Sequence, residues 1–223
     1  MLSGELGADR ALALLYVPAA NRPALTALFR LSVAMGSVLR TTTEPMIARI
    51  RLAWWREQLE ELDLGATTPA EPRLEAARTL ILPRGISGKD LAGLADGWER
   101  LLDPFPWSVA TSEGIWLRGL LAFGLAARLL GRPDERLQQA GGLWALVDAA
   151  RHCSDAETRR LLVERARTIA KGLKGAKFEP MLRPLSMLAA LAMRDLSRGE
   201  PFEPEGTPAR ALTMVRHRLI GRL

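Results

Sequence analysis

The chain has 223 residues, with 31 Lys or Arg and 25 Asp or Glu, so its formal net charge is +6. Aromatic residues make up only 5% of the chain, while Ala and Leu are abundant, and this composition favours helices over sheets. The lone cysteine, Cys153, excludes an internal disulfide and fits a reducing compartment.

No uncharged apolar stretch reaches the roughly 20 residues of a membrane span. The first ten residues lack the basic start and apolar run of a secretory signal. We therefore expect a cytoplasmic protein, with a location peripheral to the inner membrane as the alternative. The arginines are spread along the chain without interleaved aromatics, so we expect no nucleic-acid partner.

Helix signals follow one another closely in the first part of the chain. The segment Asn21-Arg-Pro23 predicts the start of a helix that reaches Arg40, and Arg30 is the only charge within it, so this helix should be central. A second helix should begin at 43–45 and end near residue 62. A polar loop over 65–72 follows.

The later elements are predicted from similar signals. Ser87 and Asp90 resemble a capping box, and Thr111 or Ser112 is expected to cap a helix that ends at Gly131. The further expected helices cover residues 74–82, 90–102, 133–153, 156–173, 180–197 and 209–219, with a proline-rich linker at 200–208.

These segments show no strand periodicity, no repeat at a fixed period and no obvious domain boundary. We therefore predict one all-α domain over residues 1–223, built as a helical bundle. The helix over 44–63 has two apolar stripes and should be packed on two sides. Arg51 lies among these stripes, so it either borders a cavity or extends its charged head to solvent.

Four other groups of residues have a functional and a structural interpretation. The acidic residues Asp96, Glu99 and Asp103 could imitate a metal site or form a solvated face. The acidic end of the helix over 57–63 could dock a partner or be solvated. His152 and Cys153 are adjacent but point in different directions on a helix, which argues against a catalytic pair. The basic end over 216–222 could contact an anionic membrane or a partner, or be a solvated terminus.

Three segments carry a resemblance to a known family. They are Asp9-Arg-Ala-Leu-Ala-Leu-Leu-Tyr16-Val-Pro18, Arg22-Pro-Ala-Leu-Thr-Ala-Leu-Phe29-Arg-Leu and Glu44-Pro-Met-Ile-Ala-Arg-Ile-Arg51-Leu-Ala-Trp54-Trp55-Arg56-Glu. Together they resemble the squalene/phytoene synthase family. The Ile-Arg-Leu-x-Trp-Trp-Arg pattern is closest to a branch that includes a mitochondrial assembly factor for respiratory complex I.

The resemblance implies an isoprenoid-synthase-type bundle with a central cavity and two helices that carry aspartate clusters. In the enzymes of the family these clusters hold Mg²⁺ against a diphosphate. The corresponding positions here are Gly36, Ser37 and Arg40 in the first helix and, after Arg151, His152 and Ala156 in the second. No Asp-x-x-x-Asp occurs in the chain, and residues 10–43 contain no carboxylate.

This replacement reverses the charge expected at the metal site. A unit positive charge about 5 Å from Mg²⁺ costs about 6–7 kcal/mol at an effective dielectric constant near 20. We therefore expect no catalytic residues, no metal site and no bound cofactor, although Mg²⁺ is usual in the family. Arg40, Arg51 and Arg151 could instead bind a diphosphate directly.

Three functions remain open from the sequence. The first is a non-catalytic protein that binds or assembles a protein partner, including respiratory complex I. The second is a binder of an isoprenoid-like lipid or lipid diphosphate. The third is an active prenyltransferase with a rearranged site. Similarity of fold alone does not decide among them.

Overall fold

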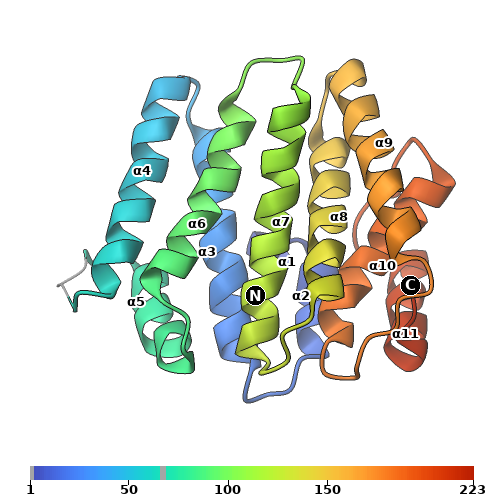
Figure 1. The fold of residues 1–223 in the computed structure, drawn as a ribbon, viewed down its shortest axis with the longest axis horizontal. Helices are drawn as coiled ribbons and strands as arrows, with labels where there is room; N and C mark the ends of the chain where they lie inside the picture. The colour runs from blue at the N-terminus through green and yellow to red at the C-terminus, as the bar shows by residue number, and fades with distance from the viewer. Residues whose placement is uncertain (1–2, 66–68) are drawn as a thin grey trace.

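The computed structural model describes residues 3–65 and 69–223, with side chains from residue 5 onward, and these residues form a layered helical bundle (Figure 1). The helices are α1 (Ser3–Leu6), α2 (Ala8–Leu15), α3 (Arg22–Thr41), α4 (Pro45–Leu62), α5 (Pro72–Ala76), α6 (Gly88–Glu99), α7 (Val109–Leu129), α8 (Glu135–His152), α9 (Ala156–Leu173), α10 (Arg183–Arg198) and α11 (Pro208–Ile220). Within the described ranges no strand forms, and an isolated antiparallel bridge joins Lys177 to Arg222.

The long helices pack in nearly the order in which they follow along the chain. Helix α4 packs on α6, α6 on α7, α7 on α8, and α8 on both α9 and α10 (Figure 1). Gly119 of α7 and Gly141 of α8 let these two backbones touch, because a Cβ at Gly119 would lie 2.2 Å from the Gly141 carbonyl oxygen. Buried apolar residues form one continuous cluster from Leu6 to Met214.

Helices α3 and α8 both run toward the upper end of the bundle in Figure 1. Their last turns carry Arg40 and His152, so these two residues lie at the same end of the molecule. Helix α7 begins at that end and runs in the opposite direction. The two helices expected to carry the aspartate clusters are therefore parallel to each other.

Most predicted helix boundaries agree with the structure to within a few residues. The capping box is confirmed, since Ser87 Oγ accepts from the Asp90 amide and Asp90 accepts from the Ser87 amide. The predicted cap of α7 was wrong, because Ser108 accepts from the Thr111 amide and the helix begins earlier. Part of the loop predicted over 65–72 lies outside the described residues.

Helix α4 is packed differently from the prediction. Its stripe with Leu52 and Leu59 is fully buried, as expected, whereas Ile47 and Ile50 of the other stripe are 46% and 62% exposed. A third face of α4 is turned toward α6, where Arg56 pairs with Asp96 and Glu99. In the part of the chain that is described, no helix combines the length and apolar character that crossing a membrane requires.

Candidate functional site

A cavity of about 590 Å³ lies between α3 and α8 and is closed by the end of α6, the connection after it and α7. Helix α3 contributes Gly36 and Arg40 to its wall, and α8 contributes Asp148 and His152. This volume is typical of a pocket for a small molecule. The two helices singled out from the sequence therefore do face a common cavity.

The position of Gly36 explains why a larger side chain is absent there. A Cβ at Gly36 would lie 2.6 Å from the indole ring of Trp98, which is closer than carbon atoms can approach. The Trp98 indole Nε1 donates a hydrogen bond to Ser32 Oγ at 3.3 Å, which fixes the ring on α3. The space that an aspartate side chain would need is therefore filled by an aromatic ring.

Arg118 of α7 stacks over that ring and is the most unusual residue of the cavity. Its guanidinium carbon is 3.8 Å from the centre of the Trp98 ring, and the residue is only 5% exposed. Among the described residues its guanidinium forms no hydrogen bond and no ion pair. A buried charge without a hydrogen bond or ion pair is costly, so the guanidinium nitrogens are available to an anion that enters the cavity.

The pKa of Arg118 reflects this environment. Burial lowers the pKa to about 10, the Asp148 carboxylate opposes that shift, and the positive charge of Arg10 adds to it. Arg118 therefore stays cationic at neutral pH. An anion bound beside it would favour the charged form and raise its pKa again.

Besides Arg118, the charged groups of the cavity wall are two arginines, Arg10 and Arg40, and two carboxylates, Glu5 and Asp148. Arg10 stacks over Trp144 at 5.5 Å, and Arg40 is exposed at the end of α3. The Glu5 carboxylate pairs with Arg30 and Arg73, which are not part of the cavity wall. Arg40 lies in the last turn of α3, where the negative end of the helix dipole stabilises its charge without a ligand. Arg118 is therefore the stronger indication of an anion site.

The cavity does not fit Mg²⁺. Magnesium needs near-octahedral oxygen ligands, usually with one or two free carboxylates. On this wall Asp148 has His152 one turn away, with Nδ1 at 3.9 Å from its Oδ1, and shares the cavity with three arginines. Within residues 3–65 and 69–223 no group of three or more His, Cys, Asp or Glu residues is arranged to hold a metal ion.

The structure does not bring the three arginines named from the sequence together. Arg40 lines the cavity, but Arg51 is exposed and donates hydrogen bonds to Thr41 and Thr42 at the turn between α3 and α4. The alternative in which the head of Arg51 reaches solvent is therefore the one observed. Ser37 donates to the Ala34 carbonyl and is not part of the cavity wall.

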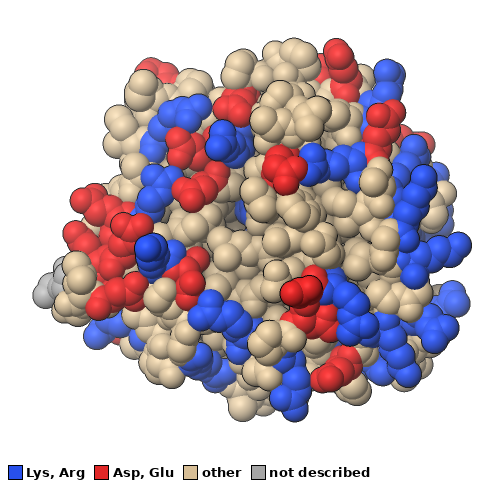
Figure 2. Space-filling model, in the orientation of Figure 1, with Lys and Arg blue, Asp and Glu red and all other residues tan. Residues whose placement is uncertain are grey.

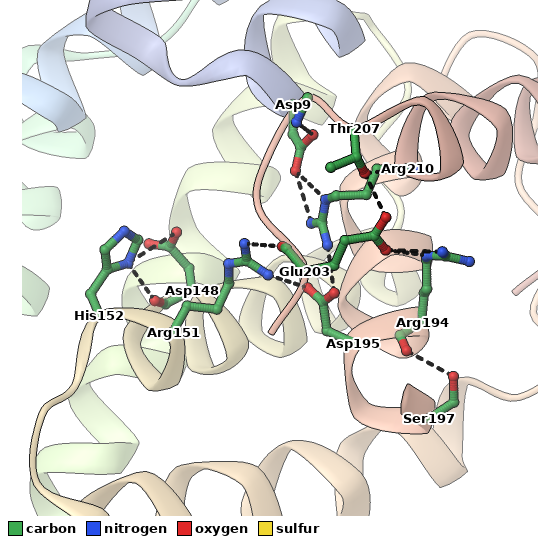
Figure 3. Close-up of polar contacts among 11 residues, drawn as sticks. Asp9, Asp148, Arg151, His152, Arg194, Asp195, Ser197, Glu203, Thr207 and Arg210 are labelled. Carbon is green, nitrogen blue, oxygen red and sulfur yellow. Dashed lines mark hydrogen bonds and ion pairs between the residues drawn. The ribbon is translucent and has the colours of Figure 1, made fainter. Parts of the chain in front are cut away.

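Arg151 belongs to a buried charge network on the other side of α8 (Figure 3). It donates to Asp195 Oδ2 at 2.9 Å, and Asp195 Oδ1 accepts from Arg210 at 2.5 Å. Arg210 also bonds to Asp9 Oδ2 at 2.8 Å. We call Asp9, Arg151, Asp195 and Arg210 the charge network; in it Arg151 is already paired, and the network joins α2, α8, α10 and α11.

The second expected motif is split by the end of a helix. Helix α8 ends at His152, and Ala156 is the first residue of α9, so the two do not lie one turn apart on one face. The residue one turn before His152 is Asp148, and both line the cavity. The imidazole Nδ1 of His152 lies 2.8 Å from the Asp148 carbonyl oxygen (Figure 3).

The sequence around Arg118 indicates a buried or cavity-lining charge, although Arg118 lies outside the two aspartate motifs of the family. Arg118 stands in the middle of an apolar helical run, Ile115-Trp-Leu-Arg118-Gly-Leu-Leu. A lone charge surrounded by apolar residues on a helix is either buried with a partner or directed into a cavity. The aromatic partner, Trp98, is on another helix and could not be assigned from spacing.

The acidic group on α6 is explained without a metal. Asp96 and Glu99 pair with Arg56, while Glu99 and Asp103 pair with Arg49. At the end of α4, Asp63 accepts bonds from the first two amides of α6. These carboxylates therefore hold α4 on α6.

Comparison with known proteins relates the first half of the chain to one family. The sequence model of the squalene/phytoene synthase family matches residues 5–113, just under half of the chain. No curated protein and no solved structure matches the chain. The match includes α3, α4 and α6 but ends before Arg118 and α8. With the helices described above, it supports the all-α isoprenoid-synthase-type fold predicted from the sequence.

Proposed function

We propose that this squalene/phytoene synthase-like protein binds an anionic ligand with an apolar tail in the α3–α8 cavity and does not turn it over. The observation that carries this proposal is Arg118, a buried guanidinium that stacks on Trp98 but has no hydrogen bond or ion pair among the described residues, at the wall of a cavity of about 590 Å³. Apolar wall residues such as Leu39, Leu101 and Trp107 suit an isoprenoid or acyl chain. The ligand class is a lipid phosphate or diphosphate.

Charge argues against catalysis of the usual kind. Ionisation of an allylic diphosphate requires neutralisation of the leaving group, which carboxylate-held metal ions provide. The cavity wall carries three arginines against two carboxylates, of which Glu5 is paired with Arg30 and Arg73, and a guanidinium binds phosphate oxygens directly. Such a site favours retention of the diphosphate over its release.

The test is thermal unfolding in the presence of EDTA with farnesyl diphosphate, inorganic pyrophosphate or uncharged farnesol. At about 100 times the dissociation constant, farnesyl diphosphate should stabilise the protein by about 2.7 kcal/mol. That corresponds to a rise in melting temperature of about 5–10 °C for a chain of this size. Farnesol should give a smaller shift, because it has no charge for Arg118.

Arg118→Met separates ligand binding from stability. The variant should lose the shift with farnesyl diphosphate, yet without ligand its stability should stay within about 1 kcal/mol of the wild type, since removal of a buried charge without a hydrogen bond offsets loss of the stack on Trp98. The matched control is Arg128→Met on the same helix, whose partner Asp90 lies outside the cavity; it should keep the shift. Equal shifts in the wild type and Arg118→Met would contradict the proposal, as would release of diphosphate above background with Mg²⁺.

A second candidate function is assembly of a protein partner, respiratory complex I being the one that the sequence resemblance suggests. The observation in its favour is the apolar outer face of α4, where Met46, Ile47 and Ile50 are 67%, 46% and 62% exposed. Exposed apolar groups of this kind are typical of protein interfaces.

Complementation of a deletion strain tests the assembly role. Deletion should lower complex I activity several-fold, and the wild-type gene should restore it. A gene that encodes Ile47→Ser with Ile50→Ser should not restore activity, although the cavity is unchanged. Normal complex I activity in the deletion strain would remove this candidate.

A further inference from the structure

Helix α11 has an apolar stripe on the side that faces away from the protein. Its inner side carries the buried residues Met214 and His217. On the opposite side, Leu212, Val215 and Leu219 are 69%, 40% and 75% exposed and lie at i, i+3 and i+7. A surface helix normally presents polar groups there, so this stripe needs another explanation.

Exposed cations lie on α11 and on the segments that pair at its end. Arg216 and Arg222 are exposed, and the terminal segment pairs with residues 175–178, which places Lys177 beside Arg222. Lys174 is exposed in the same segment, and Arg218 lies at the edge of the helix. In the described part of the chain none of these five cations forms an ion pair.

Few acidic groups lie near these cations, and Glu179, two residues after Lys177, pairs with Arg132 instead. Residues 206–223 contain no Asp or Glu. Figure 2 shows that Lys and Arg predominate over the right-hand edge of the molecule, where α9 and α11 lie. We name the exposed stripe and the five cations around it the α11 face.

We propose that the α11 face docks on an anionic lipid surface, with the helix parallel to the membrane. Aliphatic side chains at the centre enter the boundary between head groups and acyl chains, while the surrounding arginines and lysines contact lipid phosphates and carboxylates. This proposal is independent of the cavity and of what the cavity binds.

The charge of the face disfavours the other occupants. In a symmetric dimer the same patch would meet itself, so five uncompensated cations of one copy would oppose those of the other. A nucleic acid would satisfy the cations but would leave the aliphatic stripe against phosphates. An anionic bilayer satisfies both the charges and the stripe.

Co-sedimentation with vesicles tests the proposal. The full chain should bind vesicles in which about one-third of the phosphatidylcholine is replaced by phosphatidylserine, and binding to pure phosphatidylcholine should be at least about tenfold weaker. Arg216→Gln with Arg222→Gln should weaken binding about thirtyfold, at roughly fivefold per cation. Leu212→Ser with Leu219→Ser should weaken it by at least about tenfold through lost apolar burial.

The matched control is the double variant Leu64→Ser and Val109→Ser, which removes apolar groups that are 84% and 64% exposed outside the α11 face and should leave vesicle binding unchanged. All substituted residues are exposed, and melting curves verify that the variants fold. The proposal is overturned if anionic vesicles do not sediment the protein, if both α11 double variants still bind, or if light scattering shows a dimer that depends on Leu219.

Discussion

Replacement of Arg210 by methionine should lower the free energy of unfolding by about 3–5 kcal/mol, because it leaves buried carboxylates without their cation. Arg210 donates to Asp9 and Asp195, and the three residues are 3%, 4% and 2% exposed. Asp195 would keep Arg151, but Asp9 would keep only its bond from the Gly206 amide. The expected fall in melting temperature is about 6–20 °C.

Urea unfolding followed by circular dichroism measures this effect. The control is Arg216→Met on the same helix, which is exposed and should change stability by no more than about 0.5 kcal/mol. Adding Asp9→Asn to Arg210→Met should recover part of the loss, since it removes one of the stranded charges. A loss below about 1 kcal/mol in Arg210→Met would mean that water already reaches these carboxylates.

The charge network also shows what the sequence could not reveal. Arg151 looked like a ligand-binding arginine because its neighbours resemble the second motif of the family. Its partner, Asp195, is 44 positions away along the chain. Pairing across helices depends on how the helices are placed, and no local pattern encodes it.

Local signals were sufficient for most of the fold. Pro45 stands at the first position of α4, and Gly131 follows the end of α7 with φ of 65°. Pro208, assigned to the linker from the sequence, is instead the first residue of α11. Periodicity also located the buried stripe of α4. It could not tell that the stripe with Ile47 would be exposed, because an apolar pattern does not specify what covers it.

The sequence predicted that the cavity lacks the family's aspartates, but it did not predict which residues occupy that space. The sequence shows that α3 lacks carboxylates, and the structure adds that Trp98 fills the space beside Gly36. The structure also places Arg118 beside Trp98, on α7, a helix that carries neither of the two expected aspartate motifs. The arginine predicted at the end of α3, Arg40, does line the cavity.

Acid should destabilise the protein through His217, which is 4% exposed and lies 2.7 Å from Ser186 Oγ. Burial lowers its pKa to about 4; a bond to the Arg222 backbone opposes the shift, and the charge of Arg183 adds to it. The ring is therefore neutral in the folded protein at pH 7. Its unfolded pKa is about 6.5.

The sign of the effect follows from these two pKa values. Between about pH 6.5 and pH 4 the unfolded chain binds a proton that the folded chain does not, so stability is greatest above pH 6.5 and falls as the pH decreases. A shift of about 2.5 units corresponds to about 3 kcal/mol over the whole range, of which about 2 kcal/mol is lost between pH 7 and pH 5.

The measurement compares urea unfolding of the wild type and His217→Gln at pH 7 and pH 5. Carboxylates contribute equally to both proteins, so the difference between them isolates the histidine, and the wild type should lose about 2 kcal/mol more than the variant. His152→Gln, which removes the other, exposed histidine, should retain the pH dependence of the wild type. Parallel curves for wild type and His217→Gln would show that His217 does not remain neutral in the fold.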